Sequence, residues 1–379
     1  MPSKPLKFPA GFLWGAGTSA FQVEGNNSLS DWWTFDSGQS IDHYHRFQED
    51  FSLARSLGHN AHRLSLEWSR IEPLPGVFDL EAIEHYRQVL QSLKNRNLQV
   101  FLTLHHFSNP IWFSDRGGWE SGKSVGYFIR FISRVVPEFK HLVDFWITIN
   151  EPSAYAYAAY NLGKFPPQKR SFISQGKVLW NMSLAHRSAY QKIHQLIPKA
   201  KVGMTQNVTS YTLTDPGFVK NWQATVRNFL DNHLFYVLTT KCHDFLGLNY
   251  YFNRNLDRHP QPPKRVSDLG WEIKPTGIYQ ALVELSQYKL PIYITENGLA
   301  ARDDRERVAF LSDFLAEVHR SLATGVDIRG YLHWSLLDNY EWAEGFSAKF
   351  GLIGVDLATL KRTPKPSAYF YRDIIRSSK

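Results

Sequence analysis

The sequence predicts an α/β fold, a single-domain (β/α)8 TIM barrel that takes up residues 1–379. Three observations predict it: eight short β-rich apolar runs, amphipathic segments between them, and no Pro-, Gly- or Ser-rich linker long enough to separate domains. A length of 379 residues suits an α/β barrel, which stays one domain at that size. Hydrophobic residues make up 43% and charged residues 21%, which excludes disordered, collagen-like and coiled-coil chains.

The predicted strands are continuous apolar runs more often than alternating ones. The run at residues 99–104 (QVFLTL) is an example, and this pattern is typical of strands that are covered on both faces. The eight predicted strands lie within residues 12–22, 60–68, 99–107, 144–151, 201–208, 244–251, 291–296 and 328–335.

The segments between the strands carry helical periodicity. Residues 81–95 and 308–322 repeat apolar positions near a spacing of 3.6, which predicts amphipathic helices. A doubly wound sheet is the weaker alternative, because Gly15 and Gly17 lack a third glycine at the spacing of a nucleotide-binding turn. Residues 253–270 are polar and contain three prolines, so we expect a long loop on one face of the barrel.

Composition also bounds the partners. The net charge of +8 is scattered, which argues against nucleic acid, and no apolar run is long enough for a membrane span. The N-terminus lacks the apolar core of a signal peptide, so we expect a cytoplasmic location. Cys242 is the only cysteine, which excludes an intrachain disulfide and a cysteine-based metal site. The 12 Trp, 18 Tyr and 26 Phe favour a sugar-binding protein, since flat rings stack on pyranose C–H faces.

In a barrel of this kind the active site lies at the carboxyl ends of the strands. Seven of the eight predicted strands have, at or just beyond that end, side chains that can bond a hydroxyl group or stack on a sugar. They are Gln22 and Glu24; Arg63; His105 and His106; Asn150 and Glu151; Asn249, Tyr250 and Tyr251; Glu296 and Asn297; and Trp334 with Asp338, Glu341 and Trp342.

Glu151 and Glu296 are candidates for a catalytic pair. Cleavage of a glycosidic bond needs one carboxyl group to protonate the leaving oxygen and another to attack or to activate water. Arg63 would keep the attacking carboxylate ionised. Each residue alone has a structural explanation as a cap, a turn or a buried ion pair, and only their joint occurrence at strand ends indicates a site. The histidine pairs His105–His106 and His43–His45 are weak as metal ligands, and no metal or other cofactor is expected.

The chain resembles glycoside hydrolase family 1, the β-glucosidase family, over nearly its whole length. The resemblance lies in motifs that occur in the family's order. They are FLWGAGTSAFQ with VEG (residues 12–25), NAHRLSLEWSRI (60–71), WITINEP (146–152), FLGLNYY (245–251), YITENG (293–298), WSLLDNYEWAEG (334–345) and FGLIGVD (350–356).

The resemblance implies a retaining mechanism, with Glu296 as the nucleophile that forms a covalent glycosyl-enzyme and Glu151 as the acid/base. It implies that Asn150 bonds the sugar 2-hydroxyl, that Tyr251 orients the nucleophile and that Arg63 is its cationic neighbour. The remaining implied residues are Gln22, His106 and Glu341 as glycone ligands, Trp334 as the floor under the ring, Trp342 at its far hydroxyls, and Asn249 and Phe107 in support.

Two branches of the family are separated by single residues. Glu151 stands where thioglucosidases of the myrosinase type have Gln. Phospho-glycosidases have Ser, Lys and Tyr where this chain has Glu341, Ala348 and Phe350, so we expect non-phosphorylated sugars. The expected substrates are small-molecule β-glucosides, β-galactosides or β-fucosides, or oligosaccharides. Two alternatives stay open: a transglycosidase with the same residues, and a non-catalytic sugar-binding barrel. The oligomeric state is left open.

The chain departs from the family at two places. Phe107 follows His106 where the family usually has Trp; Phe keeps a ring but lacks the indole N–H, so we expect one hydroxyl contact to be absent or supplied by another residue. The chain is also short for the family, mostly between Glu151 and Glu296, where long loops wall the aglycone side. The shortening predicts a more open cleft with loose aglycone preference.

Overall fold

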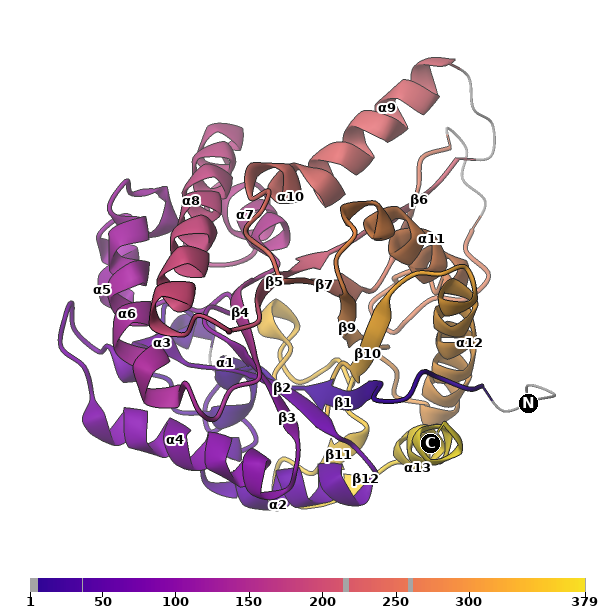
Figure 1. Cartoon of the computed structure of the whole chain (residues 1–379), viewed down its shortest axis with the longest axis horizontal. Helices are drawn as coiled ribbons and strands as arrows, with labels where there is room; N and C mark the ends of the chain where they lie inside the picture. Colours follow the sequence, from indigo (N-terminus) through magenta and orange to yellow (C-terminus); the bar gives the residue numbers. More distant parts are fainter. Residues whose placement is uncertain (1–5, 36, 214–217, 258–261, 379) are drawn as a thin grey trace.

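The computed structural model describes residues 6–35, 37–213, 218–257 and 262–378. Eight parallel strands close into a barrel in the order β1-β10-β9-β7-β5-β4-β3-β2, with the helices arranged around it (Figure 1). The barrel strands are β1 (Leu13–Gly17), β2 (Ala61–Ser65), β3 (Gln99–Thr103), β4 (Phe145–Asn150), β5 (Val202–Asn207), β7 (Phe245–Tyr250), β9 (Ile292–Asn297) and β10 (Ile328–His333). The predicted fold class is therefore confirmed.

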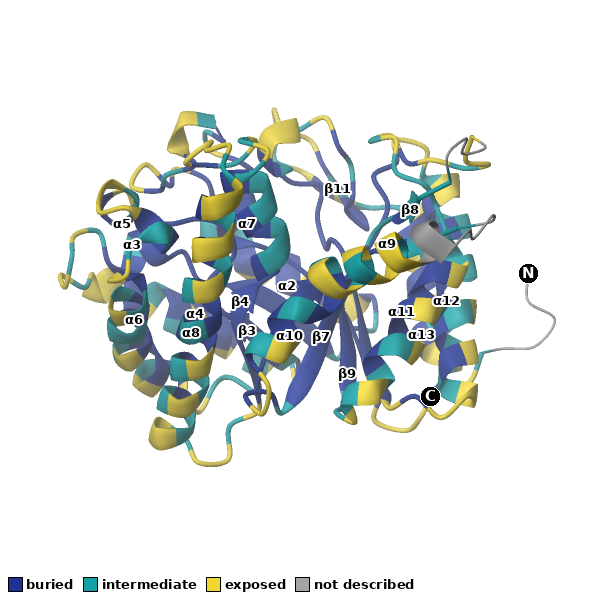
Figure 2. Cartoon of the chain, turned by 90° about the horizontal axis from the view of Figure 1, so that it is seen from above, coloured by how far each residue is buried: buried dark blue, intermediate teal, exposed yellow. Residues whose placement is uncertain are grey.

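Helices cover the outside of the barrel, and their outer faces carry the exposed residues in Figure 2. The α-helices are α1 (Ala20–Glu24), α2 (His43–Ser56), α3 (Trp68–Ile71), α4 (Leu80–Asn95), α5 (Ile111–Asp115), α6 (Ser124–Phe139), α7 (Pro152–Tyr160), α8 (Phe172–Leu196), α9 (Phe218–Asn228), α10 (Leu234–Leu238), α11 (Pro275–Leu285), α12 (Asp304–Ala323) and α13 (Pro366–Ser377). Single turns are η1 (Trp33–Phe35), η2 (Gly118–Glu120), η3 (Phe229–His233), η4 (Ser286–Tyr288) and η5 (Trp342–Glu344).

The predicted helices at residues 81–95 and 308–322 are confirmed as α4 and α12. Asp79 accepts from the backbone N–H of Ala82 at 3.0 Å and so caps the start of α4. Asp303 accepts from the N–H of Arg305 at 3.0 Å and caps α12. In both helices the apolar positions that repeat in the sequence are buried, except Leu322 near the end of α12, which is partly buried. The periodicity therefore marks the face that packs on the barrel.

The interior of the barrel is filled by side chains, not by a channel. Phe101 and Phe145 stack with ring centroids 4.1 Å apart, and Phe245 and Tyr293 pack edge-on against them. This aromatic layer is almost completely buried. It closes the barrel below the strand ends, so a ligand can enter only from the carboxyl face.

Two predicted segments differ from the structure. The first strand was expected to run to Gln22, but β1 ends at Gly17, and Gln22 lies in α1. The chain turns there because the N–H of Thr18 bonds the carbonyl of Arg63 on β2, and the Ser65 hydroxyl accepts from the N–H of Ala20. The expected loop at residues 253–270 begins with a short strand.

That short strand, β8 (Asn253–Asn255), pairs in parallel with β6 (Ser210–Thr212) outside the barrel. A second small sheet, β11 (Ile353–Val355) with β12 (Arg362–Pro364), is antiparallel. Part of the expected loop, residues 258–261, lies outside the described residues. Within the part of the chain described above, no helix is both long and apolar enough to cross a membrane.

Candidate active site

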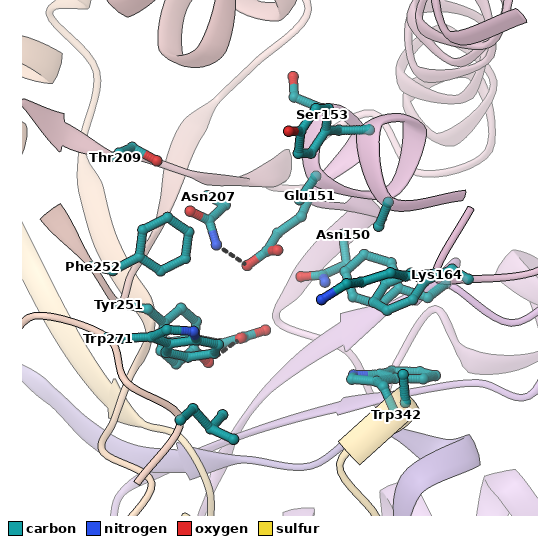
Figure 3. A pocket seen from close by; sticks show the side chains of 18 of the residues that line it. Asn150, Glu151, Ser153, Lys164, Asn207, Thr209, Tyr251, Phe252, Trp271 and Trp342 are labelled. Atoms are coloured by element: carbon teal, nitrogen blue, oxygen red, sulfur yellow. Dashed lines mark hydrogen bonds between the residues drawn. The ribbon is translucent and has the colours of Figure 1, made fainter. Parts of the chain in front are cut away.

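A cavity of about 550 Å³ opens at the carboxyl ends of the strands (Figure 3). Nine of the twelve residues expected at the site line it: His106, Phe107, Asn150, Glu151, Tyr251, Glu296, Trp334, Glu341 and Trp342. The other three, Gln22, Arg63 and Asn249, stand behind the lining and contact residues within it. The expected residues therefore lie together at the carboxyl ends of the strands.

Glu296 lies near the end of β9 and is held by two groups. The Arg63 guanidinium forms a buried ion pair with its Oε1, and the Tyr251 hydroxyl donates to its Oε2 at 2.5 Å. A guanidinium at contact distance favours an ionised carboxylate. Burial and the neighbouring Glu296 carboxylate hold the pKa of Tyr251 well above its usual range, so the phenol remains a hydrogen-bond donor.

Glu151 follows β4 and begins α7, with Pro152 at the first helical position. Asn249 donates to its Oε1 at 2.7 Å, and Asn207 donates to the same oxygen at 3.4 Å, the bond drawn in Figure 3. Burial, and then the charge of Glu296, raise the pKa of Glu151 to about 8. A pKa raised to this range favours the protonated form of Glu151 at neutral pH.

Asn150 joins the two carboxyl groups into one network. Its Oδ1 accepts from Arg63 at 2.6 Å, from Thr205 at 2.7 Å and from Asn249 at 3.2 Å. Its Nδ2 lies 3.1 Å from Nε2 of His106. Donors from three strands thus hold the Asn150 amide in place. These contacts also restrict the rotamers of Arg63 and Asn249, which bind the two carboxyl groups.

A ring-lined floor lies beside the carboxyl groups. His106 stacks with Trp334 and with Trp342, each with ring centroids 5.8 Å apart. Glu341 accepts from Nε2 of Gln22 at 3.1 Å, and burial followed by the Glu296 charge raises the pKa of Glu341 to about 8. Nδ1 of His106 and Oε1 of Gln22 are buried and have no hydrogen-bond partner among the described residues. Such a surface of rings, amides and carboxyls suits a polyhydroxylated ring.

Three residues of the cavity have left-handed backbones: Glu151 with φ 44°, Phe107 with φ 67° and Trp342 with φ 47°. Non-glycine residues in this region carry strain, which persists where surrounding contacts fix the conformation and is common at functional sites. For Phe107 the contacts are the rings of Trp342, Phe165 and Tyr155, so its side chain forms part of the cavity wall.

Some strand-end residues named from the sequence lie elsewhere. Glu24 binds Arg70 at 2.9 Å, and Asp338 binds Lys365 at 2.8 Å, both outside the cavity lining. His105 bonds Asn109 at 3.0 Å behind the wall. Across residues 6–35, 37–213, 218–257 and 262–378, no three or more His, Cys, Asp or Glu side chains are placed to hold a metal ion.

Sequence reasoning missed Asn207 at the end of β5, although it donates to Glu151. The same strand-end rule would have found it, because β5 was the one predicted strand for which no polar terminal residue was considered. Lys164, Trp271 and Arg254 also line the cavity. They come from loops and from β8, where no periodic pattern marks the residues that face inward.

Comparisons with known proteins identify the family of the chain. The family described as "Glycosyl hydrolase family 1" matches residues 4–239 and 235–379. The chain is 30% identical to beta-glucosidase A of Thermotoga maritima, covering 98% of both chains, and 31% identical to a beta-galactosidase of Sulfolobus acidocaldarius, covering 98% of this chain and 96% of the other. These alignments extend over 439 and 483 positions, so both relatives carry segments that this chain lacks.

Solved structures of glycosidases have the same fold as this chain. A beta-glycosidase from Pyrococcus horikoshii matches with a TM-score of 0.94 and 35% identity over 99% of this chain and 96% of that one. A family 1 β-glucosidase from Thermotoga maritima, in complex with isofagomine lactam, matches with a TM-score of 0.94 and 27% identity over 99% and 100%. The whole-length match in sequence and fold shows that the chain belongs to glycosyl hydrolase family 1 and is a β-glycosidase.

Proposed function

We propose that the whole chain forms one catalytic domain that hydrolyses terminal, non-phosphorylated β-linked sugars through a covalent glycosyl-enzyme. The observation that carries this proposal is the pair of carboxyl groups in one cavity. Glu151 holds a proton at neutral pH, whereas Glu296 is paired with a buried guanidinium. Opposite environments for two carboxyl groups are what acid catalysis and nucleophilic attack at one glycosidic bond require.

In this proposal Glu296 attacks the anomeric carbon while Glu151 protonates the leaving oxygen. Water, deprotonated by Glu151, then hydrolyses the glycosyl-enzyme and releases the sugar with its original anomeric configuration. Tyr251 and Arg63 hold the nucleophile, Asn249 holds the acid, and Asn150 meets the 2-hydroxyl. No metal or organic cofactor is required for these steps.

The glycone is held by Gln22, His106 and Glu341, over the floor formed by Trp334, with Trp342 at its far side. The amide and carboxyl groups of Gln22 and Glu341 can each accept or donate, so they fit an equatorial or an axial 4-hydroxyl. Glucosides, galactosides and fucosides are therefore the proposed substrates. Phe350 lines the same cavity, and Ala348 stands where phospho-glycosidases have the Lys that binds a phosphate dianion.

The proposal is tested with a panel of p-nitrophenyl β-glucoside, β-galactoside, β-fucoside and β-glucoside 6-phosphate. We expect turnover of the neutral glycosides and little of the 6-phosphate. A 6-phosphate preferred over all neutral substrates would refute the glycone assignment. No turnover by folded protein would favour the sugar-binding alternative.

The raised pKa of Glu151 predicts an alkaline limit to activity. Because the acid must be protonated, kcat/KM for phenyl β-glucoside should fall as the pH rises through about 8. Dinitrophenyl β-glucoside needs little protonation of its leaving group, so its kcat/KM should fall less over the same pH range. Because Glu341 has a pKa in the same range, equal alkaline limbs for both substrates would assign the limit to Glu341 instead.

Tyr251→Phe should slow formation of the glycosyl-enzyme. The substitution removes one hydrogen bond to the Glu296 carboxylate and keeps the ring, and a bond to a charged acceptor contributes about 1.5–3 kcal/mol, or roughly 10- to 100-fold in rate. Pre-steady-state release of nitrophenol measures this step. Tyr250→Phe is the control, since the Tyr250 hydroxyl bonds Ser210 and lies away from both carboxyl groups. Equal effects of the two substitutions would count against the role of Tyr251.

On the aglycone side the proposed cleft is open. The segments that the relatives have in excess support an open cleft and broad aglycone acceptance. A cytoplasmic location stays a prediction.

A further inference from the structure

The outer part of the cavity carries more positive than negative charge, in contrast to the carboxyl-rich inner part. Three cations line it: Lys164 between α7 and α8, Arg227 at the end of α9, and Arg254 on β8. The acidic residues among the outer lining residues are Asp231 and Glu344. The outer wall therefore has a formal excess of one positive charge.

The two guanidiniums share a single carboxylate oxygen. Nε of Arg227 lies 3.4 Å from Oδ2 of Asp231, and Nη1 of Arg254 lies 3.7 Å from the same atom. The Tyr211 hydroxyl donates to that oxygen as well. Each guanidinium has five N–H donors. The long contact with Asp231 occupies one donor of each, and Arg227 also bonds the Tyr211 side chain. With respect to the described residues, Arg227 and Arg254 therefore keep further donors for a ligand.

Lys164 lies on the opposite wall, and in Figure 3 its side chain extends toward the space beside Glu151 and Trp342. Among the described residues it has no ion pair or side-chain hydrogen bond. Lys169 in the same loop, by comparison, binds Glu120 at 2.6 Å. Lys164 is thus a cation at the cavity that no carboxylate of the described part of the chain neutralises.

Apolar surface lies between these cations. Phe252, Leu269 and Trp271 line the cavity from the segment after β7, and the rings of Phe252 and Trp271 have centroids 5.4 Å apart. Arg254 lies with its guanidinium carbon 6.0 Å from the centroid of the Phe252 ring. A ligand that packs an apolar body on these rings brings its far end within reach of a guanidinium.

We propose that the aglycone side of this site accepts an apolar or aromatic aglycone that carries an anionic group, bound by Arg254 and Arg227 with Lys164 on the opposing wall. The anionic group of the aglycone is a carboxylate, sulfate or phosphate, because guanidiniums bind these groups in a bidentate manner. The inference rests on the proposed function, since it concerns the leaving-group side of the same reaction.

The test compares 4-carboxyphenyl and 4-carbamoylphenyl β-glucosides, which differ in charge but little in shape. The measured quantity is the ratio of their kcat/KM values, acid over amide. Leaving-group differences cancel when this ratio is compared between variants. For Arg254→Gln and for Lys164→Gln we expect the ratio to fall roughly fivefold each, the effect of losing one partly exposed ion pair. High salt should lower the wild-type ratio in the same direction.

Arg305→Gln is the matched control, because Arg305 is a guanidinium on the outer surface of α12 and does not line the cavity. It should leave the ratio as in the unmodified protein. A ratio unchanged by both Arg254→Gln and Lys164→Gln, with both substrates turned over, would overturn this inference and leave the proposed function standing. Failure of the unmodified protein to cleave either glucoside would overturn the proposed function and the inference with it.

Discussion

Glu296→Ala is expected to lower glucosidase activity on the order of 10⁵-fold or more, because the covalent glycosyl-enzyme cannot form without the Glu296 carboxylate. The substitution leaves the buried Arg63 without its carboxylate partner, although Arg63 keeps bonds to Thr103 and Asn150. Some loss of stability therefore accompanies the loss of activity. Far-UV circular dichroism and the thermal midpoint distinguish a folded inactive variant from an unfolded one.

Azide provides a positive test for the same variant. The alanine leaves room beside the anomeric carbon, so azide should restore part of the activity on an activated glucoside and yield the α-glycosyl azide. Glu306→Ala, which removes an exposed carboxylate on α12, is the control and should retain full activity. Formation of the β-glycosyl azide would show that a different residue is the nucleophile.

Glu151→Ala is expected to affect substrates unequally, according to their leaving groups. General acid catalysis contributes about 10²- to 10⁴-fold, and only a poor leaving group depends on it in the first step. Phenyl β-glucoside should therefore lose about 10³-fold in kcat/KM, whereas dinitrophenyl β-glucoside should lose far less. The comparison of the two substrates separates loss of the acid from general damage to the site.

Glu67→Gln is a useful control for this variant. Glu67 is also a buried carboxyl group, and burial raises its pKa to about 7, but it bonds Ser69 and Ser108 outside the cavity lining. The Glu67→Gln substitution should change kcat/KM for both substrates by the same factor. Equal losses on both substrates for Glu151→Ala would exclude Glu151 as the acid.

The barrel could be predicted from the sequence because its strands are buried on both faces. Runs such as residues 99–104 have no polar side to obscure them, and β3 begins at the expected Gln99. The ends of the strands were less certain. Gln22 continues an apolar run but lies in α1, because tertiary hydrogen bonds from Thr18 and Ala20 to β2 turn the chain after Gly17.

The inner site followed from one geometric rule, that parallel strands bring their carboxyl ends together. From this rule Glu151 and Glu296 were expected in one cavity. The rule does not indicate which of the two carboxyl groups is protonated. The pKa of Glu151 depends on burial and on its distance from Glu296, which only the folded chain defines. The cations of the outer cavity wall could not be predicted from the sequence. Lys164 lies in a loop and Arg254 in the short strand β8, and neither segment has a periodic pattern that shows which side chains face the cavity.

The central claim is a double displacement with Glu296 as the nucleophile and Glu151 as acid and base. The most direct test is proton NMR of the sugar first released from p-nitrophenyl β-glucoside, recorded before mutarotation. A double displacement releases the β-anomer first, and the α-anomer accumulates only later. First release of the α-anomer would show a single displacement by water and contradict the proposed roles of both carboxyl groups.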